Sequence, residues 1–177
     1  AKITGTCAGG DLWTFLDAGA AKALDFTDMG MATTYKADVD VIAANARQLV
    51  QRLAEAECDA AVIEIADGVF QPETAALLRH DAVRALVHHW VFAADSAPSI
   101  LAGLNVAADA GLRLAAISGS VTTSPLALRE ARSLAHFRTL GLAELQDGAE
   151  ALSWLGEANR ARVSLYPASA AERLVAG

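Results

Sequence analysis

The sequence predicts an α/β fold with a mainly parallel β-sheet and helices on both of its faces, formed as a single domain over residues 1–177. Short runs of β-branched and other apolar residues alternate with longer segments whose apolar residues recur at helical spacing. No Pro/Ser-rich linker and no internal repeat divides the chain. Hydrophobic residues make up 54% of the composition, and much of that fraction is alanine, which favours helices covering a sheet.

The predicted strands are short apolar runs that end in polar or glycine-containing turns. The clearest is Val62-Ile63-Glu64-Ile65-Ala66, which Asp67-Gly68 closes, as expected for a buried parallel strand. The full set covers residues 2–4, 24–28, 60–66, 86–93, 112–118 and 137–140. Because helical segments separate most of these strands, we expect right-handed βαβ connections and parallel pairing.

Capping residues and apolar spacing predict the helices between these strands. Asp38 is a good N-cap for an amphipathic helix, and Pro72 and Pro125 stand where first helical turns are expected. Gly111 is the expected terminator of a helix that starts near Asp95. The predicted helices cover residues 39–57, 72–78, 95–111, 126–133 and 144–155, and residues 12–22 form either a short helix or an irregular excursion.

Charge and composition exclude several classes of partner. The net charge is -7, so the chain as a whole offers no cationic field for nucleic acid or for an anionic membrane. No apolar run approaches the roughly 18 residues of a membrane span. Two cysteines without metal-type spacing exclude a disulfide scaffold, and the cytoplasm is the expected location. Trp13, Trp90 and Trp154 are candidates for an exposed homodimer patch.

Several unusual residues fall at the ends of predicted strands. Three glycines between residues 5 and 11 form a loop whose backbone N–H groups can approach an anion, with a plain glycine-rich turn as the alternative. Asp67-Gly68 and Ser118-Gly119-Ser120 follow two other strands. In open parallel sheets, ligands bind beyond the carboxyl ends of the strands, so we expect a small-molecule site there.

Glu64 is the most unusual of these residues because it interrupts an apolar run. An uncompensated buried charge costs several kcal/mol, so a cation or a strong donor must lie beside Glu64, or the strand must open into a site. Structural roles are the alternative. Glu64 would then pair with a neighbouring lysine or accept backbone N–H bonds, and Asp67 would cap the helix that follows.

Two stretches together resemble the dethiobiotin synthetase-like branch of P-loop NTPases. Lys2-Ile3-Thr4-Gly5-Thr6 is similar to its K-P-[VI]-x-[TS]-G strand end, and residues 62–68 are similar to its apolar strand ending in V-E-G-x-G or a Walker-B-like acid. Residues 118–130 resemble the late region in which such proteins hold the base. The chain also resembles an uncharacterised bacterial family of predicted P-loop proteins. The resemblance implies a P-loop NTPase-like, Rossmann-like three-layer fold, with ATP and Mg²⁺ as cofactors.

The resemblance also implies roles for individual residues. Lys2 would contact an anionic substrate group or phosphate, Glu64 would hold Mg²⁺, and Asp67 would position metal or water. Ala66 departs from the family, which has glycine at this position. The residues implied around the nucleotide are Thr4, Gly5, Thr6, Gly68 and Ser118.

The motif G-x-x-x-x-G-K-[ST] does not occur in this sequence. In the resembled family it precedes the K-P strand, and it supplies most of the phosphate binding. We therefore expect an N-terminally truncated domain whose P-loop lies upstream of Ala1, in an ATP- and Mg²⁺-dependent ligase or synthetase acting on a small carboxylate or amine. The alternative is a non-catalytic anion- or nucleotide-binding α/β domain.

Overall fold

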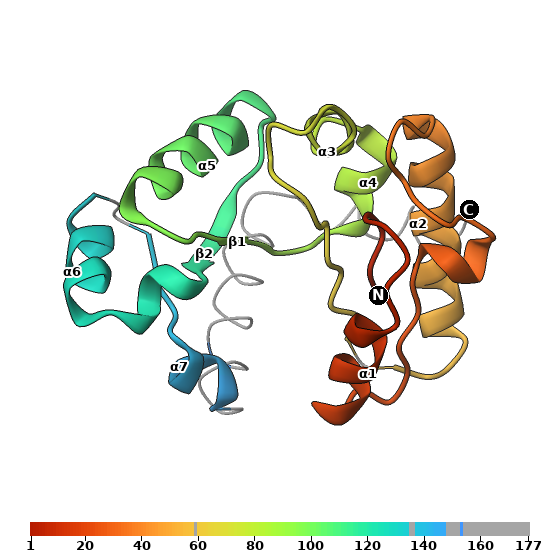
Figure 1. Cartoon of the computed structure of the whole chain (residues 1–177), viewed down its shortest axis with the longest axis horizontal. Helices are drawn as coiled ribbons and strands as arrows, with labels where there is room; N and C mark the ends of the chain where they lie inside the picture. Colours follow the sequence, from red (N-terminus) through yellow and green to blue (C-terminus); the bar gives the residue numbers. More distant parts are fainter. Residues whose placement is uncertain (59, 135–136, 148–152, 154–177) are drawn as a thin grey trace, which may run out of the picture. The chain divides into compact units, whose positions relative to one another are not determined.

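The computed structural model describes residues 1–58, 60–134, 137–147 and 153 (Figure 1). The chain forms two compact units, Ala1–Val87 and His88–Gly177. Within each unit, chain segments pair in parallel and helices connect them, as the sequence predicts. Among the described residues, the helices are too short or too polar for one to cross a membrane.

The first unit is built on three short segments that pair in parallel at single residues. Lys2 forms parallel bridges to Asp25 and to Glu64. The Lys2 N–H donates to the Leu24 carbonyl at 3.0 Å, and the Ile3 N–H donates to the Glu64 carbonyl at 2.9 Å. Lys2 therefore lies on the middle segment, between the other two.

These three segments are shorter than the predicted strands because each turns almost at once. Gly5 adopts a φ of 137°, which ends the segment at Thr4. Asp67 adopts a φ of 71°, and the Asp25 carboxylate caps a 3₁₀ helix, η1 (Phe26–Met29). The predicted buried strand at 60–66 is wrong in one respect, since Val62 is 84% exposed.

The helices of the first unit are α1 (Gly10–Asp17), α2 (Val39–Ala54), α3 (Pro72–Leu77) and α4 (Asp81–Leu86). The Asp38 carboxylate accepts the Asp40 N–H at 2.8 Å, which confirms the predicted cap of α2. The predicted cap of α3 is wrong: Gln71, not Asp67, accepts the Thr74 N–H. Helix α4 also occupies the start of the predicted strand 86–93.

The core of the first unit joins α2 to the paired segments. Its buried members are Ile3, Leu24, Ala46, Leu49 and Leu53, with Ile63 and Ile65 packed against them. The apolar stripe of the amphipathic helix therefore covers one face of the three segments, and burial of these side chains outweighs the small number of backbone pairs.

The second unit contains the regular strands β1 (Trp90–Ala93) and β2 (Leu114–Ser118), which pair in parallel and are connected by α5 (Ala97–Asp109). On its other side, β2 bridges Thr139: the Ile117 N–H donates to the Arg138 carbonyl at 2.8 Å. The order is thus β1, β2 and the segment around Thr139, as the alternation of elements predicts.

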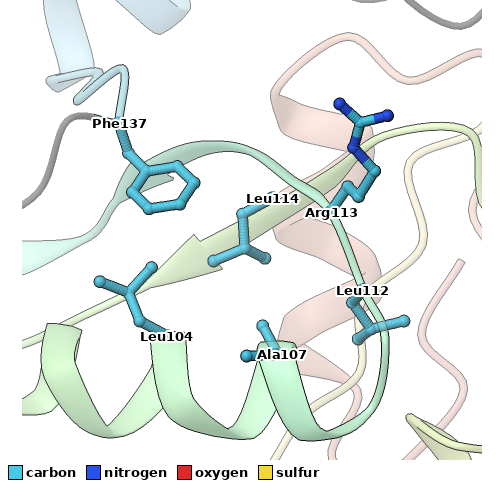
Figure 2. A pocket seen from close by; sticks show the side chains of 7 residues that line it. Leu104, Ala107, Leu112, Arg113, Leu114 and Phe137 are labelled. Carbon is cyan, nitrogen blue, oxygen red and sulfur yellow. The ribbon is translucent and has the colours of Figure 1, made fainter.

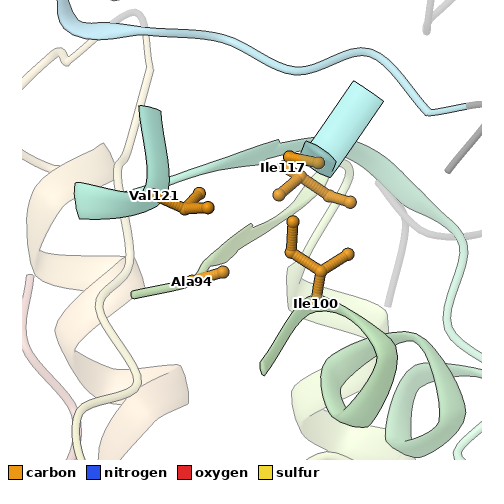
Figure 3. Packing of buried hydrophobic residues seen from close by; sticks show 5 residues of the cluster. Ala94, Ile100, Ile117 and Val121 are labelled. Atoms are coloured by element: carbon orange, nitrogen blue, oxygen red, sulfur yellow. The ribbon is translucent and has the colours of Figure 1, made fainter. Parts of the chain in front are cut away.

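The remaining described helices are η2 (Ser120–Thr123), α6 (Pro125–Leu134) and α7 (Leu142–Gln146). Ala94, Ile100, Ile117, Val121 and Ala131 form the buried cluster of this unit, and Figure 3 shows the side chains of β2, α5 and η2 meeting there. Most of the helix predicted over 144–155 lies outside the described residues, and so does Trp154.

Candidate functional site

The Lys2 side chain lies beneath the glycine loop of the first unit and is only 12% exposed. A Cβ atom placed on Gly5 would lie 3.0 Å from Lys2 Cε and 3.5 Å from the Phe26 ring. The positive φ of Gly5 also disfavours any other residue. Glycine at this position therefore allows the loop to pack directly on the aliphatic part of the Lys2 side chain. The ammonium group lies beyond this contact.

The Lys2 ammonium forms an ion pair with the Asp11 carboxylate of α1. The hydrogen bond to Asp11 raises the pKa of Lys2 above its ordinary value; burial opposes this, and the charges of Glu64 and Asp67 add to it. Lys2 is consequently a cation at neutral pH. It can bind an anion or offset negative charge, and it is unsuited to act as a general base.

Glu64 stands directly opposite Lys2 in the parallel bridge, so the two side chains leave the same face of the paired segments. Glu64 is half-buried rather than buried, which corrects the premise drawn from its apolar neighbours. Lys2 is the cation beside Glu64 that the sequence predicts, and the two interact electrostatically. Within the described part of the chain, no side-chain hydrogen bond occupies the Glu64 carboxylate, which leaves its oxygens available to a ligand.

Asp67 lies at the end of the same segment as Glu64, on a turn whose geometry is fixed from two sides. The Ala66 carbonyl accepts the Thr4 hydroxyl at 3.0 Å and the Thr74 hydroxyl at 3.3 Å. Beyond the turn, the Gly68 carbonyl accepts the Gln71 N–H at 2.9 Å. Asp67 itself is exposed and acts on Lys2 electrostatically. The rim around the Lys2 ammonium thus holds the carboxylates of Asp11, Glu64 and Asp67, and the Ala1 ammonium also interacts with Glu64.

Threonines from the loop after η1 hold the Gly5-Thr6 corner. The Gly5 N–H donates to the Thr34 hydroxyl and the Thr34 N–H donates to the Gly5 carbonyl, both at 2.9 Å. The Thr6 and Thr33 hydroxyls are hydrogen-bonded at 3.0 Å. Thr4 and Thr6, predicted as ligand contacts, thus already have protein partners that fix the loop.

Ser118, the remaining predicted contact, lies in the second unit. It is buried, and its hydroxyl donates to the Leu140 carbonyl at 2.7 Å, which fastens the segment around Thr139 to β2. The structure therefore gathers the other predicted residues in the first unit: Lys2, Thr4, Gly5, Thr6, Glu64, Asp67 and Gly68.

Asp11 is the site residue that the sequence did not single out. Its partner depends on where α1 lies, which the sequence pattern does not show. An acidic residue in the first turn of a helix that follows a glycine loop is the signal that could have identified it.

The described residues contain no group of three or more His, Cys, Asp or Glu side chains that could hold a metal ion by themselves. Mg²⁺ does not require one, because it is commonly bound through one or two carboxylates, waters and substrate phosphates. The free oxygens of Glu64 fit that mode as a single protein ligand, and a complete protein-only magnesium site does not fit.

An apolar hollow of about 300 Å³ lies in the second unit, between the end of α5, the start of β2 and Phe137. Figure 2 shows Leu104, Leu114 and Phe137 facing it, with Arg113 at its edge. None of the residues predicted from the sequence as a site lines it, so the charged rim and this hollow are separate features.

Comparisons of this chain with protein families, with curated proteins and with solved structures found no significant match. The likeness to the dethiobiotin synthetase-like branch therefore stands on the two short motifs, and the functional argument rests on the geometry of the rim.

Proposed function

We propose that the first unit binds the anionic part of a small-molecule ligand, as a magnesium–nucleotide complex, at the rim formed by Lys2, Glu64 and Asp67. The unit would thereby serve a nucleotide-dependent ligase or synthetase with a three-layer, P-loop NTPase-like fold. The observation that carries the proposal is the pairing of Lys2 with Glu64 on the middle and outer parallel segments, next to the turn that presents Asp67.

The charge of the rim favours a magnesium complex over a bare phosphate. The carboxylates of Asp11, Glu64 and Asp67 outnumber the Lys2 and Ala1 ammonium groups, so a lone polyanion would meet net repulsion at close range. A divalent cation reverses that sign, and Glu64 offers it a carboxylate free of hydrogen bonds. The charge balance therefore supports a ligand that brings its own cation.

Within such a complex, each protein group has a definite task. Lys2 stays protonated and offsets negative charge on a phosphoryl or carboxyl oxygen. Asp67, on its fixed turn, accepts a hydrogen bond from water or a substrate amine. Glu64 would hold the magnesium that the ligand brings, and the ion would offset negative charge on the phosphate.

The proposal is tested by the thermal unfolding of the protein with ATP and Mg²⁺, with ATP and EDTA, and with Mg²⁺ alone. At a ligand concentration of 100 times Kd, the complex should stabilise the fold by about 2.7 kcal/mol. Glu64→Gln should abolish most of this shift, whereas Glu130→Gln, the same charge change on the exposed side of α6, should preserve it. An equal shift in both variants would contradict the role of Glu64.

The second candidate is a non-catalytic anion- or nucleotide-binding domain. It is supported by the way Thr33 and Thr34 fix the Gly5-Thr6 corner next to the Lys2 side chain, whose ammonium can hold an anion without any metal. This candidate predicts an equal shift with ATP in EDTA. A shift that requires Mg²⁺ excludes it and favours the magnesium-dependent proposal.

A further inference from the structure

Helix α1 is a poorly packed element beside the Lys2 rim. Each of its residues, all within the described range 1–58, is exposed or half-buried, and Trp13 is 69% exposed. A helix of 8 residues has little stability of its own in water. Its position must therefore depend on a small number of contacts with the rest of the first unit, and those contacts can be identified.

The chain before α1 is hydrogen-bonded to the rest of the first unit up to Cys7, and the residues that follow are exposed. The Cys7 N–H donates to the Ala32 carbonyl at 2.9 Å, which continues the pairing of Thr6 with Thr33. Residues 8–10 are exposed, and a Cβ placed on Gly10 would meet nothing within 4 Å. A Cβ placed on Gly9 would meet the ring of Trp13 at 3.6 Å, and the Gly9 carbonyl accepts the Trp13 N–H at 3.3 Å. Because Trp13 belongs to α1 itself, these contacts move with the helix, and Ala8-Gly9 can serve as its hinge.

The contact that ties α1 to the rim is the ion pair between Asp11 and Lys2. Asp11 is 43% exposed, so water and solutes reach its carboxylate, whereas the lysine stem is enclosed. The Asp11 carboxylate thus occupies the ammonium that an incoming phosphate or carboxylate would use. Protein and ligand compete for one cation.

We propose that α1 is a latched lid: Asp11 is an internal competitor for Lys2, and a ligand anion that takes its place releases the helix from the rim. This inference rests on the proposed function, because it assumes that ligand binds at Lys2. The observed affinity then depends on the fraction of molecules in which the ion pair between Asp11 and Lys2 is broken. Removing the Asp11 charge should therefore tighten binding, which is the opposite of what a ligand-contacting residue would do.

The test compares Asp11→Asn with Asp17→Asn, the same charge change on the same helix but away from Lys2, using ATP with Mg²⁺ as the probe. If the latch is closed in about nine molecules of ten, Asp11→Asn should lower the Kd roughly tenfold. Asp17→Asn should leave the Kd close to that of the unmodified protein. Lys2→Met should abolish binding, and Lys22→Met is its control.

The outcomes separate the two claims. If Lys2→Met abolishes binding while Asp11→Asn leaves it unchanged or weaker, the latch is overturned and the proposed function stands. If Lys2→Met binds as well as the unmodified protein, the proposed function fails and the latch fails with it.

A second measurement on the unmodified protein does not depend on any variant folding correctly. Hydrogen exchange at the amides of α1 should become faster when the ligand binds, because the helix leaves the rim. Fluorescence of Trp13 should change at the same ligand concentration, and Trp13→Phe should remove that change. Slower exchange across α1 on binding would overturn the lid.

Discussion

The two units differ in what stands at the carboxyl ends of their paired segments. In the second unit these positions hold hydroxyls, and each is used by the backbone: Ser118 donates to the Leu140 carbonyl at 2.7 Å and Thr122 to the Gly119 carbonyl at 2.8 Å. In the first unit Asp67 stands at such an end, and Lys2 and Glu64 face each other within the paired segments. These three residues interact through charge.

This difference indicates where chemistry can occur. A hydroxyl that already donates to a buried carbonyl has little left to offer a ligand, whereas a half-buried carboxylate without hydrogen bonds remains available. Both units have a buried cluster, but the second has a continuous strand ladder with one irregularity at Trp90/Val91, while the first has single bridges with ionised residues among them. In the first unit, the backbone pairing is therefore limited to single residues at the positions that carry charged side chains.

The largest expected effect on the free energy of unfolding comes from a glycine in the turn after β2 of the second unit. Gly119 has a φ of 102°, and an added Cβ would lie 2.4 Å from the Ala94 carbonyl oxygen. Gly119→Ala should lower the free energy of unfolding by about 3 kcal/mol or more. Gly10→Ala, in open space, should change it by less than about 0.5 kcal/mol. Chemical denaturation measures both, and equal effects would contradict this account of the Gly119 turn.

The next effect tests whether the Ser118 hydroxyl stabilises the fold or binds the ligand. Ser118→Ala should lower the free energy of unfolding by about 1–2 kcal/mol, because the buried Leu140 carbonyl loses its hydrogen bond. It should leave the Kd for ATP with Mg²⁺ unchanged. Titration calorimetry beside denaturation provides both quantities. Weaker nucleotide binding in a folded Ser118→Ala variant would restore the role that the sequence suggested for it.

A smaller effect follows from the raised pKa of Lys2. A group whose pKa is raised on folding contributes stability that is complete below its ordinary pKa, about 10.4 for lysine, and is lost as the pH rises through the raised value. The free energy of unfolding should therefore fall more steeply above pH 10.4 in the unmodified protein than in Lys2→Met. Parallel pH curves would mean that Asp11 does not hold this ammonium.

The smallest effect concerns Asp95 in the second unit. Hydrogen bonds with the Ser99 and Ser96 hydroxyls lower the pKa of this exposed carboxyl. Its contribution to stability is present above the ordinary value of about 3.9 and is lost as the pH falls through the lowered one. Proton titration by NMR should find a lowered pKa for Asp95, and Ser99→Ala should bring it back towards the ordinary value. An ordinary pKa before that change would remove this effect.

The sequence predicts helix starts well, because the capping residue and the backbone groups that it binds are only a few residues apart. Asp38, Pro72 and Pro125 mark true helix starts, because capping depends on neighbouring backbone alone. The start of α4 was missed because its cap is His80, whose Nδ1 accepts the Ala82 N–H at 3.2 Å, and histidine is not a usual cap.

Long-range placement explains what the sequence could not predict. The sequence predicts a neighbouring lysine as one of the possible partners of Glu64. That this lysine is Lys2 depends on which chain segments pair with each other. Asp11 lies nine residues from Lys2, but the glycine-rich loop between them does not show that α1 turns back to the Lys2 ammonium. The lengths of the first unit's segments depend on positive φ values at Gly5 and Asp67, and aspartate is an uncommon residue there.

The central claim is that the Lys2 ammonium receives the ligand anion, and NMR of the lysine side chains tests it most directly. The chain contains three lysines, Lys2, Lys22 and Lys36, so the spectrum of isotope-labelled lysine is simple to assign. On addition of ATP with Mg²⁺, the account predicts that the Lys2 resonance moves while those of Lys22 and Lys36 stay in place. A Lys2 resonance that does not move when the nucleotide has bound would contradict the account.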